Sequence, residues 1–203
     1  MEIIFPILIL LLSVVLHEVS HGFTAYFLGD PTAKLAGRLT LNPLKHLDPV
    51  GSVLIPLLTY TTGGFIFGWA KPVPYNPYNL KAGRWGPALV GAAGPAANFV
   101  IALFFSVLIR LAAVGLALPQ PFLELATLVV LLNLILAIFN LFPIPPLDGS
   151  KILLAVLPYR YRWLEEWLNR YQLIFIIILL LFLWRWILPI VLFLFHLATG
   201  LTI

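Results

Sequence analysis

The stretch Leu16-His17-Glu18-Val19-Ser20-His21-Gly22 lies inside an almost wholly apolar segment that runs from residue 3 to residue 28. On an α-helix, residues four apart lie on the same face, so His17 and His21 can both reach one metal ion. Glu18 lies about 100° further round the helix, where it can handle a metal-bound water without binding the metal itself. The stretch fits the pattern His-Glu-x-x-His, whose chemistry is zinc-dependent hydrolysis of peptide bonds.

The composition predicts that this motif lies in a membrane. The chain has 203 residues, of which 62% are hydrophobic and 10% charged, whereas soluble domains have roughly 25% charged residues. We therefore expect an integral, multi-pass membrane protein. Polar side chains at membrane depth are costly and usually mark a functional site, which favours a site over a polar patch satisfied by neighbouring helices.

Three further features of the composition limit the class of protein. The absence of cysteine excludes disulfides and thiolate metal ligands. The net charge of +4 indicates Lys and Arg facing the membrane surface rather than nucleic-acid binding. The N-terminal apolar segment has Glu2, no basic start and no small-residue cleavage site, so we expect it to be retained rather than removed as a signal peptide.

The apolar pattern predicts an all-α membrane protein, a polytopic helix bundle forming a single domain over residues 1–203. The first span covers residues 3–28 and stops at Gly29-Asp30-Pro31. The later apolar blocks are residues 50–69, 88–118, 122–142 and 171–199. Residues 158–170 predict an amphipathic helix at the membrane interface. Residues 171–199, broken by Arg185 and Pro189, predict one tilted span or a span plus a shorter segment.

The block 50–69 is the weakest helix candidate, because Pro56, a Thr-rich run and Gly63-Gly64 interrupt it. The proline-rich segment that follows predicts extended chain. We therefore expect a re-entrant or extended segment between the first two true spans, with a short β-strand as one form it could take. Residues 66–77 are the candidate edge that would hold a substrate by strand addition.

A third metal ligand is needed, because catalytic zinc usually has three protein ligands and a water. Asp148 stands out among the few acidic residues, since it follows an apolar span and a proline-broken stretch and has Gly149 beside it. Asp48 and His46 compete with it, although a polar loop makes a cap or surface role their default interpretation.

A run of small residues from Gly91 to Ala97 allows the backbone of the 88–118 span to approach another helix closely. Asn98 is the polar member next to this run. It is interpreted equally well as a hydrogen-bonding residue between packed helices or as a partner of a metal ligand.

The chain resembles the site-2 protease family of intramembrane metalloproteases, the M50 peptidases, over residues 1–157. The motifs that carry the resemblance are His17–His21, Gly94-Pro95-x-x-Asn98 and Asn140-x-x-Pro143-x-Pro145-x-Leu147-Asp148-Gly149. Two more are similar to smaller bacterial and archaeal members: Asn42-Pro43-x-x-His46-x-Asp48-Pro49 and Gly68-Trp69-Ala70-Lys71-Pro72-Val73.

The resemblance implies one Zn²⁺ per chain held by His17, His21 and Asp148, with Glu18 as the catalytic base. It also implies that Asn140 contacts the substrate or the oxyanion. The expected partners are a transmembrane protein or peptide as substrate and the lipid bilayer, in a prokaryotic cell membrane. We expect no PDZ or CBS domain within these residues.

Two other functions fit this sequence less well than an intramembrane protease. A catalytically inactive protein that only binds membrane segments would have no need of Glu18. A metal or ion transporter is the less favoured of these two alternatives. The polar groups of a transporter would be spread along a path across the membrane rather than clustered at one depth.

The shared zinc also predicts the topology. Asp148 can meet His17 only if the chain crosses the membrane an even number of times between them, so one of the three intervening blocks does not cross. We expect 50–69 to be that block. The connections 29–49, 70–87 and 144–170 then lie on one side with ten of the twelve Lys and Arg residues, which makes that side cytosolic and opens the active site toward it.

Overall fold

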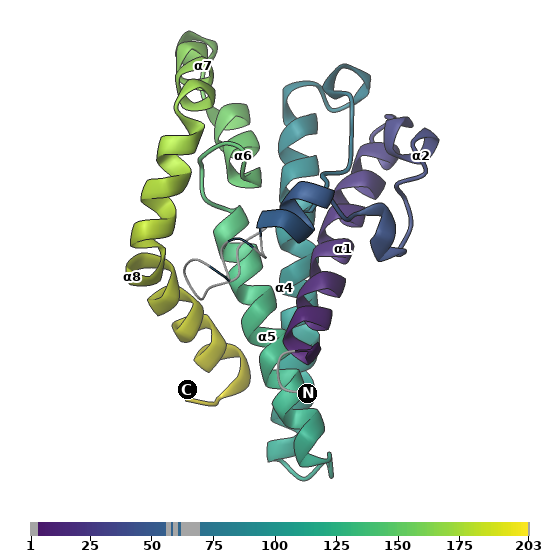
Figure 1. Cartoon of the computed structure of the whole chain (residues 1–203), viewed down its shortest axis with the longest axis vertical. Helices are drawn as coiled ribbons and strands as arrows, with labels where there is room; N and C mark the ends of the chain where they lie inside the picture. The colour runs from purple at the N-terminus through teal and green to yellow at the C-terminus, as the bar shows by residue number, and fades with distance from the viewer. Residues whose placement is uncertain (1–3, 56–57, 59–60, 62–69, 203) are drawn as a thin grey trace.

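The computed structural model describes residues 4–55, 58, 61 and 70–202, and within them the chain is helical with short connections and no strand (Figure 1). The elements are α1 (Ile4–Phe27), α2 (Thr32–Leu35), η1 (Pro43–Lys45), η2 (Pro49–Leu54), η3 (Pro77–Asn79), η4 (Gly83–Trp85), α4 (Gly86–Ala113), α5 (Gln120–Asn140), α6 (Asp148–Val156), η5 (Tyr159–Tyr161), α7 (Arg162–Arg170) and α8 (Gln172–Thr199).

Three helices in the described part are long and apolar enough to cross a membrane: α1, α4 and α5. This confirms the all-α, polytopic membrane fold. Helix α4 packs against both α1 and α5, and α8 packs on α4 and α5. The core between α4, α5 and α8 contains the buried side chains of Ile109, Val130, Val191 and Phe195. Close packing of this kind is what holds helices together in lipid, where burial of apolar surface alone gives little.

Helix α1 ends where the sequence predicts a stop. Gly29 has a φ of 103°, a left-handed conformation that costs glycine little. The Gly29 N–H then donates to the Tyr26 carbonyl (3.0 Å) and the Asp30 N–H to the Ala25 carbonyl (2.9 Å). These two bonds form a Schellman cap, which satisfies the last carbonyls of the helix and turns the chain away from it.

Asp30 fastens the end of α1 to the segment that leads into α4. Its side chain is fully buried and accepts hydrogen bonds from the Thr32 hydroxyl (2.6 Å), the Asn76 N–H (2.6 Å) and the Asn79 amide (2.8 Å). Burial alone would raise the pKa of Asp30, but these hydrogen bonds outweigh burial and hold the pKa below its ordinary value. The carboxylate is therefore a permanent anchor at neutral pH.

The two ends of the segment around the 50–69 block meet. The Lys71 N–H donates to the His46 carbonyl (2.9 Å), and the Arg38 guanidinium donates to the Lys71 carbonyl (2.7 Å). Residues 46 and 71 therefore lie side by side, as a re-entrant course between them requires. The predicted re-entrant course itself lies mostly outside the described residues; its described start is η2, a π-helical turn.

The last apolar block, predicted as one span or as a span plus a shorter segment, forms the single helix α8. It is one helix of 28 residues with Pro189 inside it, and its course bends on the way to the C-terminus (Figure 1), as an internal proline predicts. The Arg110 side chain from α4 donates to the carbonyls of Leu197 and Ala198 (2.6 Å each). A cation at a helix C-terminus is favourable, so Arg110 helps to dock α8 on α4.

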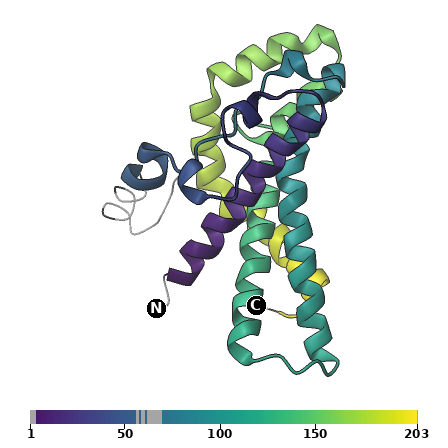
Figure 2. The same ribbon diagram turned by 90° about the vertical axis from the view of Figure 1, so that its right-hand side faces the viewer.

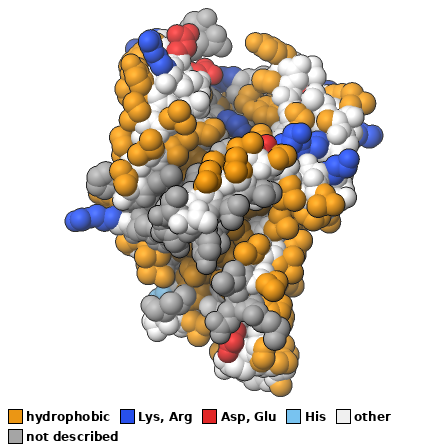
Figure 3. Space-filling model, in the orientation of Figure 1, with side chains coloured by type: hydrophobic (Ala, Val, Ile, Leu, Met, Phe, Trp, Pro, Cys, Tyr) orange, Lys and Arg blue, Asp and Glu red, His pale blue; other side chains and the backbone are white. Residues whose placement is uncertain are grey.

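The molecule has two unlike ends. Helices α2, α6 and α7 gather at the end opposite both chain termini, and the two ribbon views agree on this (Figures 1 and 2). On the face seen in Figure 3, most of the visible Lys and Arg side chains lie in that half, and most of the described side chains below them are apolar. A basic end above an apolar girdle is the distribution expected of a protein inserted in a bilayer.

Candidate metal centre

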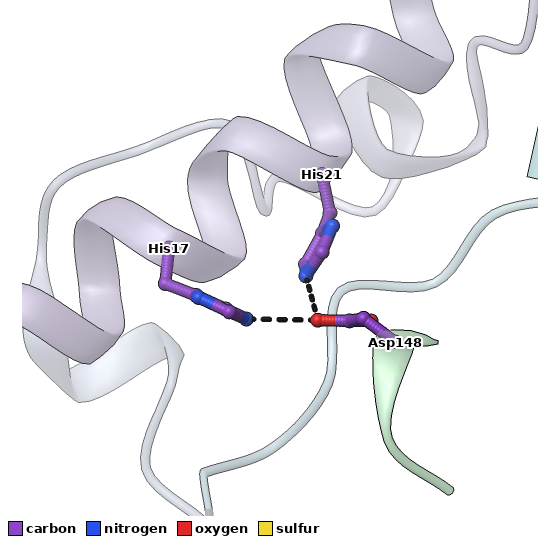
Figure 4. A group of neighbouring side chains, drawn as sticks. All are labelled: His17, His21 and Asp148. Atoms are coloured by element: carbon purple, nitrogen blue, oxygen red, sulfur yellow. Dashed lines mark hydrogen bonds and ion pairs between the residues drawn. The ribbon is translucent and has the colours of Figure 1, made fainter. Parts of the chain in front are cut away.

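Three side chains from two distant parts of the chain converge on one point (Figure 4). The Asp148 Oδ2 atom lies 3.1 Å from His17 Nε2 and 3.0 Å from His21 Nε2, and all three side chains are buried. Within the described residues this is the group of His, Asp and Glu side chains that could hold a metal ion. The four-residue spacing on α1 places both imidazoles on the face that meets Asp148.

The outer nitrogens of the two imidazoles are both held by acceptors. His21 Nδ1 lies 2.6 Å from the Val90 carbonyl, which can only accept, and His17 Nδ1 lies 2.6 Å from Asn98 Oδ1. Each Nδ1 therefore donates its proton, and each Nε2 faces Asp148 Oδ2. In a charged ring Nε2 donates to the carboxylate, and in a neutral ring its lone pair can bind a metal ion beside the same oxygen.

The arrangement fits zinc. Bonds of 2.0–2.2 Å from Zn²⁺ to nitrogen and oxygen ligands in a tetrahedron put neighbouring ligand atoms about 3.3 Å apart, close to the 3.0 and 3.1 Å observed. Two imidazoles and one carboxylate also form a ligand set that leaves a fourth position for water, as catalytic zinc sites do.

A chain of buried amides supports His17 from behind. Asn98 accepts from His17, and its amide nitrogen donates to Asn133 Oδ1 (2.8 Å). Asn133 in turn donates to the Ser13 hydroxyl (2.9 Å). Both amide side chains are fully buried. Asn98 therefore combines the two roles left open by the sequence, because it orients a candidate metal ligand and also bonds α4 to α5.

Gly94 forms the wall of the site on α4. A Cβ atom at this position would lie 2.5 Å from both His17 Nε2 and His21 Nε2, closer than atoms in contact can approach. The absence of a side chain leaves the space beside the two nitrogens open, so the small-residue run serves the site as well as helix packing.

Asp148 reaches the site because the chain unwinds before it. After α5 ends, the proline-rich stretch delivers Asp148 as the first residue of α6. A Cβ at Gly149 would collide with the backbone of Leu141 and Phe142, so only glycine fits next to Asp148. The other carboxylate oxygen, Oδ1, accepts from Lys151 Nζ at 2.9 Å.

Lys151 adds a positive charge beside the candidate ligands. Burial alone would lower the pKa of Lys151, but the Asp148 carboxylate outweighs burial and raises the pKa above its ordinary value. The Lys151 ammonium also lies 5.5 Å from the centre of the Tyr75 ring. By holding Oδ1, it directs Oδ2 of Asp148 toward the histidines.

Glu18, the expected base, is half-buried next to His17 on α1. Its Oε2 atom accepts a hydrogen bond from the Val73 backbone N–H at 2.8 Å. Asn140, the expected substrate or oxyanion contact, is the last residue of α5 and donates to the Leu136 carbonyl of its own helix (2.9 Å). Its role therefore stays a prediction.

The two competing ligands have other partners. Asp48 Oδ1 caps η2 by accepting from the N–H groups of Val50 and Gly51 (3.0 and 2.7 Å). The His46 Nε2 atom lies 2.8 Å from the Thr40 carbonyl. Neither joins the group around His17, so the structure assigns both to the loop.

Sequence reasoning missed Lys151, Asn133 and Val73. Lys151 was detectable, because a cation three residues after Asp148 lies on the same face of a helix. Asn133 was also detectable, as one of the two amides inside the 122–142 block, the other being Asn140. The Val73 contact left no signal, because it is made by a backbone group 55 residues from its partner.

Comparisons with known proteins identify the family to which the chain is related. The model of Peptidase family M50 matches residues 5–120 and 106–183. The chain is 40% identical over 157 residues to the candidate zinc metalloprotease YwhC of Bacillus subtilis, covering 75% of this chain and 68% of the relative. It is 36% identical over 143 residues to the candidate zinc metalloprotease Rip2 of Mycolicibacterium smegmatis, covering 68% of this chain and 52% of the relative.

A more distant relative is zinc metalloprotease MJ0392 of Methanocaldococcus jannaschii, which is 28% identical over 159 residues. That match covers 78% of this chain and 36% of the relative, so the chain spans only part of the length of several relatives. No solved structure matches the chain at a significant level.

Proposed function

The chain belongs to Peptidase family M50, and we propose that it is a zinc-dependent protease that hydrolyses peptide bonds of membrane-spanning substrates. The observation that carries the proposal is the meeting of His17 Nε2, His21 Nε2 and Asp148 Oδ2 at one buried point, with both Nδ1 atoms held by acceptors. The names of the relatives, which refer to zinc metalloproteases, support the choice of metal.

His17, His21 and Asp148 would hold one Zn²⁺ per chain. When bound, zinc supplies a Lewis acid that polarises the scissile carbonyl and lowers the pKa of water to about 7. Glu18 accepts a proton from the attacking water and later donates it to the leaving amine. Asn98 and the Val90 carbonyl keep the histidines in the tautomer that can bind metal, and Asn140 is proposed to contact the substrate or its oxyanion.

The substrate must arrive with its backbone unwound, because the amides of a helix are occupied by their own hydrogen bonds. Strand addition along residues 66–77 remains a prediction, and it falls partly outside the described residues. In the described part, Pro72 and Pro74 have no N–H to offer and the Val73 N–H is bound to Glu18. Within residues 72–74, therefore, no N–H is free to pair with a substrate strand.

The proposal is tested by reconstituting the protein into liposomes with a panel of single-span membrane proteins. We expect cleavage within or next to the span, loss of cleavage on treatment with a zinc chelator, and recovery when zinc is restored. Metal analysis should find one zinc per chain. Zinc binding without cleavage of any substrate would favour an inactive binder of membrane segments, and cleavage that resists the chelator would contradict the proposed chemistry.

We also propose that the site opens toward the cytosol and that the N-terminus lies on the other side. The support is the basic end of the molecule, where the connections carry ten of the twelve Lys and Arg residues. Single cysteines replacing the exposed residues Lys45, Lys81 and Gln120 can be tested on intact cells with an impermeant thiol reagent.

Lys45→Cys and Lys81→Cys are expected to be protected together and Gln120→Cys to be labelled. Permeabilised cells, in which all three should react, provide the control. Labelling of only one of the first two would mean that the 50–69 block spans the membrane.

A further inference from the structure

The backbone N–H of Val73 is the polar contact made to Glu18 from outside α1, at 2.8 Å from Oε2. We propose that the Pro72-Val73-Pro74 tripeptide is a backbone clamp that positions the Glu18 carboxylate for proton transfer. Val73 acts in this clamp as a positioning residue through its main chain, not through its side chain. The inference rests on the proposed function, because it assigns a partner to the proposed base.

The sequence of the clamp allows only one donor. Pro72 and Pro74 lack a backbone N–H, and their rings hold φ near −65°, which favours extended chain. If the segment shifted by one residue, a proline would face Glu18 and the bond would be lost. The tripeptide therefore offers Glu18 a single donor in a backbone with little freedom.

The clamp is anchored on both sides by buried charged residues. Before it, Lys71 is bonded through its N–H to the His46 carbonyl (2.9 Å) and through its carbonyl to the Arg38 guanidinium (2.7 Å). After it, the Asn76 N–H donates to Asp30 Oδ2 (2.6 Å). Arg38 is 6% exposed and Asp30 is fully buried. These anchors fix the Val73 N–H relative to the end of α1, where the histidines also lie.

Gly22 makes room for the clamp on the surface of α1. The Val73 side chain is buried, and a Cβ at Gly22 would lie 2.9 Å from its Cγ1 atom. Because Gly22 has no side chain, the clamp lies close to the backbone of α1. From there the Val73 N–H reaches the carboxylate of Glu18, which is one helical turn before Gly22.

The contact matters because a glutamate carboxylate rotates freely about its last bond. Fixing Oε2 leaves Oε1 as the oxygen that accepts the proton from water, at a constant position relative to the ligands on the same helix. Misplacing a reacting group by about 1 Å costs on the order of a hundredfold in rate. We therefore expect loss of the N–H to lower kcat while KM and bound zinc stay unchanged.

The direct test replaces the Val73 amide by an ester, by incorporating the hydroxy acid analogue of valine. This removes the N–H and keeps the side chain. The matched control is the same replacement at the exposed Val114, whose N–H donates to the Leu111 carbonyl (3.2 Å) at the other end of α4. We expect the Val73 ester to lower kcat by about tenfold to a hundredfold, with zinc content and KM close to those of the Val114 ester. A Val73 ester that turns over like the control would overturn the clamp.

A second measurement does not depend on turnover. In metal-free protein labelled with ¹⁵N-valine, the Val73 amide proton should resonate downfield, because it donates to a carboxylate, and should move upfield in Glu18→Ala, which removes the acceptor. The signal is assigned by its loss in Val73→Ala. An unchanged shift in Glu18→Ala would show that the bond does not exist and would reject the clamp whatever the rates.

The failure of the clamp can be told apart from the failure of the proposed function. If Glu18→Gln is inactive but the Val73 ester is fully active, the clamp is wrong and the protease assignment stands. If Glu18→Gln cleaves like the wild type, Glu18 is not the base, and the proposed mechanism fails together with the clamp.

Discussion

Replacing Glu18 with Gln is expected to leave the metal in place and to slow peptide hydrolysis by about 10²- to 10⁴-fold. The three candidate ligands are untouched by the change, and the Gln side-chain oxygen can still accept from the Val73 N–H. Only the ability to accept and donate a proton is lost. Metal analysis and a cleavage assay on the same preparation measure both effects.

Glu166→Gln is the matched control, since it makes the same chemical change at an exposed position of α7. It should cleave at the wild-type rate. If Glu18→Gln hydrolyses substrate at a rate near that of Glu166→Gln, then Glu18 has no role as a base. If it loses zinc instead, the glutamate contributes to metal binding and the assignment of the three ligands must be revised.

Asp148→Ala is expected to reduce zinc affinity by more than the roughly 10- to 100-fold typical of residues that only support a ligand, and to abolish cleavage. The change removes the carboxylate oxygen 3.0 and 3.1 Å from the two imidazole nitrogens and leaves Lys151 without its partner. Zinc per chain, measured after dialysis against a weak chelator, gives the result directly.

Asp48→Ala serves as the control, because Asp48 caps η2 and lies outside the group. It should keep its zinc. Gly94→Ala gives an independent check: every ligand remains, but a methyl group is added 2.5 Å from both Nε2 atoms, and this variant should also fail to bind zinc. Retention of zinc by Asp148→Ala, with loss from Asp48→Ala, would place the third ligand in the loop.

The fold could be predicted from the sequence where a local signal decides it. The four-residue spacing of His17 and His21, and the glycine that ends α1, depend only on residues near in the chain, and the structure follows them. Asp148 could be singled out because prolines unwind the chain before it. The predicted ends of the later helices are off by a few residues, since α4 begins at Gly86 and α5 ends at Asn140.

Contacts between distant segments could not be predicted in the same way. The hydrogen bond between the Lys71 N–H and the His46 carbonyl involves only backbone groups. Because nearly every residue carries these groups, no side-chain pattern predicts the bond. The parity of membrane crossings predicts a re-entrant course for the segment between these two residues, and most of that segment lies outside the described residues. The link from Asn133 to Ser13 is likewise invisible until α1 and α5 are placed side by side.

The amide chain behind His17 also constrains how the protein is made. Ser13, Asn98 and Asn133 lie within three separate spanning helices and are bonded to one another only when all three are present. An asparagine facing lipid alone is unfavourable, and helices carrying such groups associate through them. During synthesis, α1 and α4 should therefore stay at the insertion machinery until α5 emerges, and the three helices should enter the lipid as one unit, with His17 already bonded to Asn98 before Asp148 is made.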